Sequence, residues 1–286
     1  MDPSTPIVIA SMAVALPACW MVSHLGSRLA YMALEEDLAS SEGKQDQAGL
    51  KIFQPPPQCP QCAATLSAAE MLPVLGWAMS GGHCRSCGSG IPGLYPVAEA
   101  VSLLVPPAAL LIYGVTPAAL VFSLACWTLI ALALMDAGFG LVVDRLTLPL
   151  LGGALLAAAL DLWPLPPEDA ILGAFTGWAY LRLGNWYTAR RHGDDAATGW
   201  GDMKLAAAIG ALTGPVLIFV LLVASTGIAS LLMVAVAAAR RTSPAQARLR
   251  FAPVLVPISL MALALPGFIS VDSAMAAAGR YLGGMP

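Results

Sequence analysis

Long apolar stretches alternate with shorter polar ones along this 286-residue chain. A helix needs about 20 mostly apolar residues to cross the roughly 30 Å hydrocarbon core of a bilayer. Six apolar runs approach that length, at 6–22, 97–114, 118–135, 146–162, 169–186 and 252–271. The pattern therefore predicts an all-α membrane protein that crosses the bilayer several times.

A seventh apolar stretch, 203–239, is too long for one crossing. As a single helix it would measure about 55 Å, against a hydrocarbon core of about 30 Å. Thr213-Gly214-Pro215 and Ser225-Thr226-Gly227 are the available breaks. Counting this stretch as two short passes gives about eight transmembrane helices.

Residues 23–95 interrupt the apolar pattern and carry ten charged residues. We expect a water-exposed domain here, between a first transmembrane helix at 1–22 and a membrane-embedded domain at 96–286. No Lys or Arg precedes the first apolar run, whereas a signal peptide normally begins with a basic segment. The sequence therefore favours a first helix that is retained.

Composition supports this interpretation. Hydrophobic residues make up 58% and charged residues 11%, whereas soluble domains average about 45–50% and about 25%. An ordinary soluble enzyme and a disordered chain are both disfavoured. The net charge of −3 provides no basic surface for nucleic acid.

Basic residues set the expected orientation, because cytoplasmic loops are enriched in Lys and Arg. Such residues occur at three loops. The first has Arg145, the second is surrounded by Arg182, Arg190, Arg191 and Lys204, and the third has Arg240, Arg241, Arg248 and Arg250. Placing all three loops in the cytoplasm puts both termini outside and the polar domain inside.

Four cysteines form two C-x-x-C pairs, Cys59/Cys62 and Cys84/Cys87, with 21 residues between them. This spacing is typical of a structural zinc ion bound by four thiolates. Thiol redox chemistry and disulfides are the alternatives, and a reducing cytoplasm argues against disulfides. His83 is expected at the surface. The other two cysteines lie in apolar runs and are expected as small buried side chains: Cys19 and Cys126.

Three aspartates lie at the edges of apolar runs: Asp136, Asp144 and Asp202. Ionisable residues at such positions are candidates for function, and two carboxyl groups can act as general base and general acid. The alternative is that they cap helices or pair with Arg145 or Lys204. Two glycines precede Asp202 and would let the backbone approach a substrate strand.

Ordered motifs along most of the chain resemble those of the bacterial type IV prepilin peptidases, in the GxGD group of aspartic proteases. Those in the polar domain are Cys59-Pro60-x-Cys62, Leu72-Pro73-Val74-Leu75-Gly76-Trp77, Gly82-His83-Cys84-Arg85-Ser86-Cys87 and Tyr95-Pro96-Val97-x-Glu99. Those in the membrane domain are Asp136 with Asp144-x-Leu146-Thr147-Leu148-Pro149-Leu150, Gly199-x-Gly201-Asp202-x-Lys204-Leu205 and Phe251-x-Pro253. An early block is partly present as Gly26-Ser27-x-Leu29.

This resemblance implies a multi-pass aspartic endopeptidase of the bacterial inner membrane that removes the leader of prepilins or pseudopilins at the cytoplasmic face. It implies Asp136 and Asp202 as the catalytic pair, and the four cysteines as zinc ligands. It also implies methylation of the new N-terminus with S-adenosylmethionine. Asp144 has Arg145 beside it and Thr147 three residues on, which favours a helix cap.

Two other functional classes compete with the protease. A proton-coupled transporter could use Asp136 and Asp202 as proton carriers, but coupling carboxylates usually lie near the bilayer midplane in proteins with internal repeats. A zinc-sensing membrane scaffold would leave the Gly199-x-Gly201-Asp202 motif unexplained.

Overall fold

Apart from isolated β-bridge positions at Thr65 and between His83 and Gly90, the regular structure of the described residues is helical. The computed structural model describes residues 72–192, 199–240 and 250–265, together with Cys59, Cys62, 64–67, Ala69 and Glu70. The expected first helix at 6–22, Cys19 and the early block at 26–29 lie outside the described residues. The all-α expectation is confirmed for the described part of the chain.

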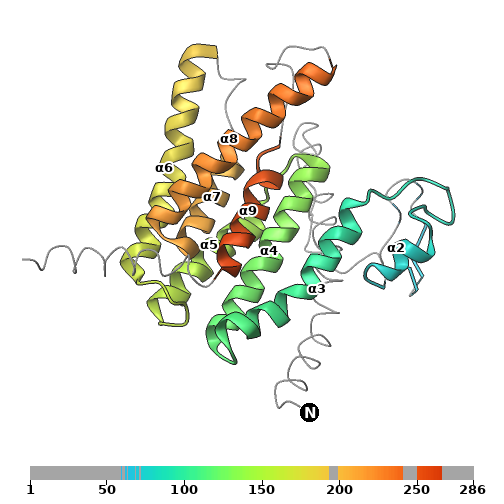
Figure 1. Ribbon diagram of the computed structural model, residues 1–286, viewed down its shortest axis with the longest axis horizontal. Helices are drawn as coiled ribbons and strands as arrows, with labels where there is room; N and C mark the ends of the chain where they lie inside the picture. The colour runs from blue at the N-terminus through green and yellow to red at the C-terminus, as the bar shows by residue number, and fades with distance from the viewer. Residues whose placement is uncertain are drawn as a thin grey trace, which may run out of the picture.

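One short helix precedes a bundle of longer ones (Figure 1). The elements are α2 (Leu75–Met79), α3 (Leu94–Tyr113), α4 (Pro117–Phe139), α5 (Asp144–Ala159), α6 (Pro167–His192), α7 (Trp200–Thr213), α8 (Pro215–Arg240) and α9 (Ala252–Ala264). Each expected apolar segment from residue 97 onward corresponds to one or two of these helices.

Glycine and proline set the helix boundaries. Gly140 and Gly214 follow α4 and α7 with φ of 73° and 79°, a region that disfavours other residues. Pro117 and Pro215 begin α4 and α8, where a missing backbone N–H leaves no intrahelical bond unmade. The break at 213–215 therefore divides the long apolar stretch, and α8 continues without interruption through 225–227.

Helix α7 lies at the centre of the bundle, with residues 205–213 all buried. It packs against α6 through glycines. A Cβ atom at Gly173 or Gly177 of α6 would overlap backbone oxygens of Gly210 or Ala206 of α7. Small residues allow this close approach of two helix backbones, as in membrane helix pairs.

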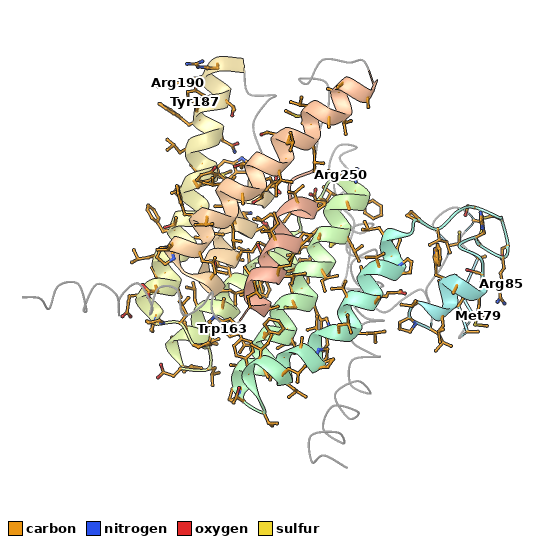
Figure 2. All side chains as sticks on the ribbon, viewed as in Figure 1. Met79, Arg85, Trp163, Tyr187, Arg190 and Arg250 are labelled. Carbon is orange, nitrogen blue, oxygen red and sulfur yellow. The ribbon has the colours of Figure 1, made fainter. Side chains whose placement is uncertain are left out.

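A cluster of aromatic residues closes one end of the bundle. Trp163 donates its indole N–H to the Leu212 carbonyl at 2.8 Å, and its ring lies 5.3 Å from that of Tyr113. Tyr113 in turn donates to the Leu263 carbonyl. Figure 2 shows Trp163 at this end and Arg250 at the opposite end. The expected aspartate site lies at the Arg250 end.

Three described helices are long and apolar enough to cross a membrane: Leu94–Tyr113, Pro117–Phe139 and Pro215–Ala239. Helices α5, α7 and α9 have 16, 14 and 13 residues and are shorter than a typical crossing. The count of eight crossings stays a prediction.

Candidate active site and metal centre

The four cysteines of the two C-x-x-C pairs come together in space. Their Sγ atoms all lie within 4.8 Å of one another, with Cys59 to Cys87 at 3.8 Å and Cys62 to Cys84 at 3.9 Å. These distances exclude S–S bonds of about 2.05 Å. A tetrahedral zinc ion with Zn–S bonds of about 2.3 Å sets its sulfurs about 3.8 Å apart. The geometry and the ligand chemistry therefore suit a metal ion such as zinc.

Local backbone geometry presents the second cysteine pair. Gly88 has a φ of 70°, and its N–H donates to the Cys84 carbonyl at 2.8 Å, which closes a tight turn. The Ser89 hydroxyl lies 3.1 Å from Cys87 Sγ and 3.8 Å from Cys59 Sγ. A hydroxyl at this position can donate to a thiolate and steady the ligand set.

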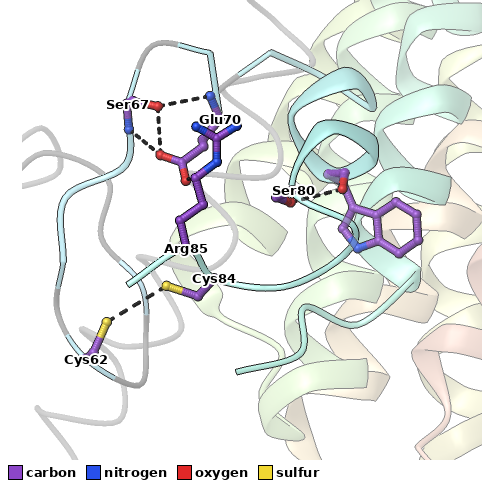
Figure 3. A network of polar contacts seen from close by, with 7 residues as sticks. Cys62, Ser67, Glu70, Ser80, Cys84 and Arg85 are labelled. Atoms are coloured by element: carbon purple, nitrogen blue, oxygen red, sulfur yellow. Dashed lines mark hydrogen bonds and ion pairs between the residues drawn. The ribbon is translucent and has the colours of Figure 1, made fainter. Parts of the chain in front are cut away.

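A small polar network lies beside the cysteines (Figure 3). The Glu70 carboxylate accepts hydrogen bonds from the Ser67 N–H and hydroxyl at 2.8 and 2.7 Å, and lies 3.6 Å from Arg85. The Ser67 backbone N–H is the main reason that the pKa of Glu70 is lowered, followed by the Ser67 hydroxyl. This capping arrangement connects the segment between the two C-x-x-C pairs to the second pair.

The cysteine region is joined to the membrane bundle through α3. Glu99 of α3 accepts a hydrogen bond from the Val74 N–H at 2.7 Å. Trp77 of α2 donates its indole N–H to the Ile91 carbonyl at 3.0 Å. The two expectations for single residues are confirmed: His83 is exposed and Cys126 is buried.

Asp136 lies in the last turn of α4 with 5% of its surface exposed. Its Oδ2 accepts a hydrogen bond from the Ala252 backbone N–H at 3.0 Å, at the start of α9. A buried carboxylate normally needs such a donor. Two helices, α4 and α9, therefore fix the position of the Asp136 carboxylate.

Asp202 lies in the first turn of α7, where the helix dipole favours a negative charge. Asp202 is half-buried, and the adjacent Gly201 contacts Val142 in the loop that directly follows the helix of Asp136. Two residues 66 positions apart in the sequence are thus brought to one end of the bundle. Paired carboxyl groups of this kind can share a single proton.

Gly201 is used differently from the expectation. A Cβ atom there would lie 2.7 Å from Val142 Cβ and 2.9 Å from the Val142 carbonyl oxygen. The absence of a side chain therefore makes room for the chain's own α4–α5 loop, residues 140–143.

The prediction that Asp144 caps a helix is wrong. Val143 is the residue at the cap position of α5, and no side chain there makes a capping hydrogen bond. Asp144 is instead the first helical residue, and its Oδ2 lies 2.5 Å from Lys204 Nζ. The carboxylate is directed across to α7 because a cation is within reach there. The alternative reading, pairing with Lys204, is the correct one.

Two contacts of the segment that leads into α9 were missed. Arg250 donates to the Ala137 carbonyl near the end of α4, and Ala252 donates to Asp136. Both residues belong to or adjoin the Phe251-x-Pro253 motif. The signal available in the sequence was a basic residue directly before a helix start, next to an otherwise unexplained motif.

Comparison with known families is consistent with these motifs. The sequence model of the type IV leader peptidase family matches residues 123–237, and that of the bacterial Peptidase A24 N-terminal domain matches residues 10–113. Together the two matches cover most of the chain. The chain belongs to the type IV leader peptidase family. The family domain contains both Asp136 and Asp202, and the N-terminal domain contains all four cysteines.

Several relatives carry the name prepilin leader peptidase/N-methyltransferase. One from Aeromonas salmonicida (strain A449) is 34% identical over 172 residues, 59% of this chain and 58% of the relative. One from Bacillus subtilis (strain 168) is 36% identical over 172 residues, which are 58% of this chain and 64% of the relative. One from Dickeya chrysanthemi is 37% identical over 164 residues, 56% of each. The matched part is thus less than two thirds of each relative's length. No solved structure matches the chain.

Proposed function

We propose that this leader peptidase family member is a membrane aspartic endopeptidase that removes the leader of prepilins or pseudopilins. The observation that carries the proposal is the position of the two aspartates at one end of the bundle: Asp136 lies in the last turn of α4, and Asp202 lies in the first turn of α7, beside the loop that follows α4. Both residues lie within the matched family domain. The relatives' name supports prepilins as the substrate class.

The two aspartates divide the work of hydrolysis between them. The Ala252 N–H favours the ionised form of Asp136, because a hydrogen bond donated to a carboxylate stabilises its charge. Asp136 then acts as general base for the attacking water, and Asp202 holds the shared proton and donates it to the leaving amine. A zinc ion held by Cys59, Cys62, Cys84 and Cys87 would stabilise the cysteine region and would take no part in these steps.

We further propose that the active site lies at the cytoplasmic face of the bacterial inner membrane. Supporting this, basic residues of the bundle lie toward the same end as the aspartates: Arg145 is in the first turn of α5, Arg190 and Arg191 are in the last turn of α6, Lys204 is near the start of α7 and Arg250 precedes α9. The other end carries Asp161 in the α5–α6 loop, and Glu168 and Asp169 in the first turn of α6. The positive-inside rule assigns the first end to the cytoplasm.

N-methylation of the new N-terminus with S-adenosylmethionine is proposed as a second activity. The relatives' printed name supports it. Residues 26–29, where the family's early block is only partly present, lie outside the described residues. We therefore assign no side chain to the methyl donor.

A proton-coupled transporter explains the observations less well. Both aspartates lie in terminal helix turns at one end of the bundle, whereas coupling carboxylates usually lie near the midplane.

The test is cleavage of a prepilin by the purified protein in detergent, with the products identified by mass spectrometry. We expect one cut, between the leader and the mature pilin. When S-adenosylmethionine is added, the mass of the mature pilin should rise by about 14 Da, which corresponds to one methyl group at its N-terminus. An intact prepilin after incubation with zinc-loaded protein would contradict the proposal.

A further inference from the structure

The α4–α5 loop, residues 140–143, follows the helix that carries Asp136 and contacts the helix that carries Asp202. It follows Asp136 by one helical turn, and the Gly140 N–H donates to the Asp136 carbonyl at 2.8 Å. Arg250 donates to the Ala137 carbonyl on the same turn. The position of the loop is therefore set by the end of α4.

The start of α7 contacts this loop and the residue after it, through two residues that lie on either side of Asp202 in the sequence. Gly201 approaches Val142 so closely that a Cβ atom would lie 2.7 Å from Val142 Cβ. Lys204 Nζ lies 2.5 Å from Asp144 Oδ2, directly after the loop. Asp202 is thus held between a backbone contact and an ion pair.

The ion pair is too exposed to contribute much to folding. The side chains of Lys204 and Asp144 are 34% and 51% exposed. Pairs of this kind typically stabilise a protein by about 0–1 kcal/mol. What distinguishes this pair is its position, because it joins the first residue of α5 to the helix that carries Asp202.

We propose that Asp144 and Lys204 are positioning residues, whose ion pair holds the start of α7 in register with the α4–α5 loop so that Asp202 faces Asp136. This inference rests on the proposed function. A displacement of about 1 Å can lower a catalytic rate about 100-fold, so a weak contact can matter greatly for the reaction. Neither side chain contacts the substrate in this account.

The experiment measures prepilin cleavage at several substrate concentrations for four variants and the wild type. Asp144→Asn and Lys204→Met each remove the pair, Lys204→Arg keeps it, and Asp144→Lys with Lys204→Asp reverses it. We expect kcat to fall about 10- to 100-fold in the first two variants with little change in KM. Lys204→Arg is expected to stay near the wild type, and the reversed pair to recover most of the loss.

Glu168→Gln is the matched control, since it removes an exposed carboxylate from the first turn of α6 at the other end of the bundle. Rates are compared per zinc-loaded molecule, so that loss of folded protein does not count as loss of activity. Unchanged kcat in both single variants would overturn the inference while leaving the proposed function standing. An inactive reversed pair beside an active Lys204→Met variant would also overturn it, because Asp144 would then act directly in the chemistry. A wild-type protein that cleaves no prepilin would remove the proposed function and this inference with it.

Discussion

The backbone N–H of Ala252 donates to the carboxylate of Asp136 at 3.0 Å, although 116 residues separate the two in the sequence. The contact joins the first residue of α9 to the last turn of α4. It gives a structural reason for the Phe251-x-Pro253 motif, because a proline in the first helical turn fixes a helix start. The motif places one backbone donor at the buried aspartate.

Zinc binding is the first prediction. We expect one zinc ion per chain, and loss of that zinc in Cys59→Ser or Cys84→Ser, with lower protein yield because structural zinc contributes to folding. Cys126→Ser is the control, since this cysteine is buried among apolar residues of α4. Elemental analysis of the purified proteins measures the ratio. Zinc-free wild-type protein with four freely titratable thiols in the cysteine region would contradict the assignment.

The orientation of the chain can be tested with single cysteines and a membrane-impermeant maleimide in intact cells. Thr116→Cys, in the loop between α3 and α4, should be labelled from outside. Ser243→Cys should be protected until the cells are opened; Ser243 lies outside the described residues, and its side is predicted from the basic residues around it. Labelling of Ser243→Cys in intact cells would mean that 203–239 does not make two passes.

Gly201→Ala should damage the active site because the new Cβ atom would lie 2.7 Å from Val142 Cβ. Overpacking of this kind typically costs about 1–3 kcal/mol, and here it would displace Asp202 from Asp136. We expect a large loss of cleavage rate. Gly152→Ala in α5 is the matched control, since no atom lies within 4 Å of its Cβ position. Equal rates for the two variants would show that the contact with Val142 does not position Asp202.

Acid should weaken the polar network beside the cysteines. Glu70 has a lowered pKa in the folded protein, because the Ser67 N–H and hydroxyl stabilise its charge. Its stabilising effect is therefore present above the ordinary Glu value of about 4.3 and is lost as the pH falls through the lower, folded-state value. The difference in thermal stability between wild type and Glu70→Gln should be greatest near neutral pH and should shrink in acid. A difference that grows as the pH falls would contradict this assignment.

The sequence predicts those features that depend on local chemistry. The helix breaks at 114–117 and 213–215 follow from glycines and prolines, and the cysteine cluster follows from its own spacing. Contacts between distant residues were not predictable. Nothing local indicates that Gly201 meets Val142 or that Asp144 reaches Lys204, because both depend on how α5 and α7 pack. The same limit explains why Asp144 was expected to cap a helix.

The central claim is that Asp136 and Asp202 form the catalytic pair and that Asp144 does not. The most direct measurement is prepilin cleavage by Asp136→Asn, Asp202→Asn and Asp144→Asn proteins with equal zinc content. We expect no detectable cleavage by the first two variants, because each lacks one of the two groups that exchange protons with the substrate. Asp144→Asn should retain measurable cleavage, with a stability change of about 0–1 kcal/mol from the lost ion pair. An active Asp136→Asn protein beside an inactive Asp144→Asn protein would contradict the account.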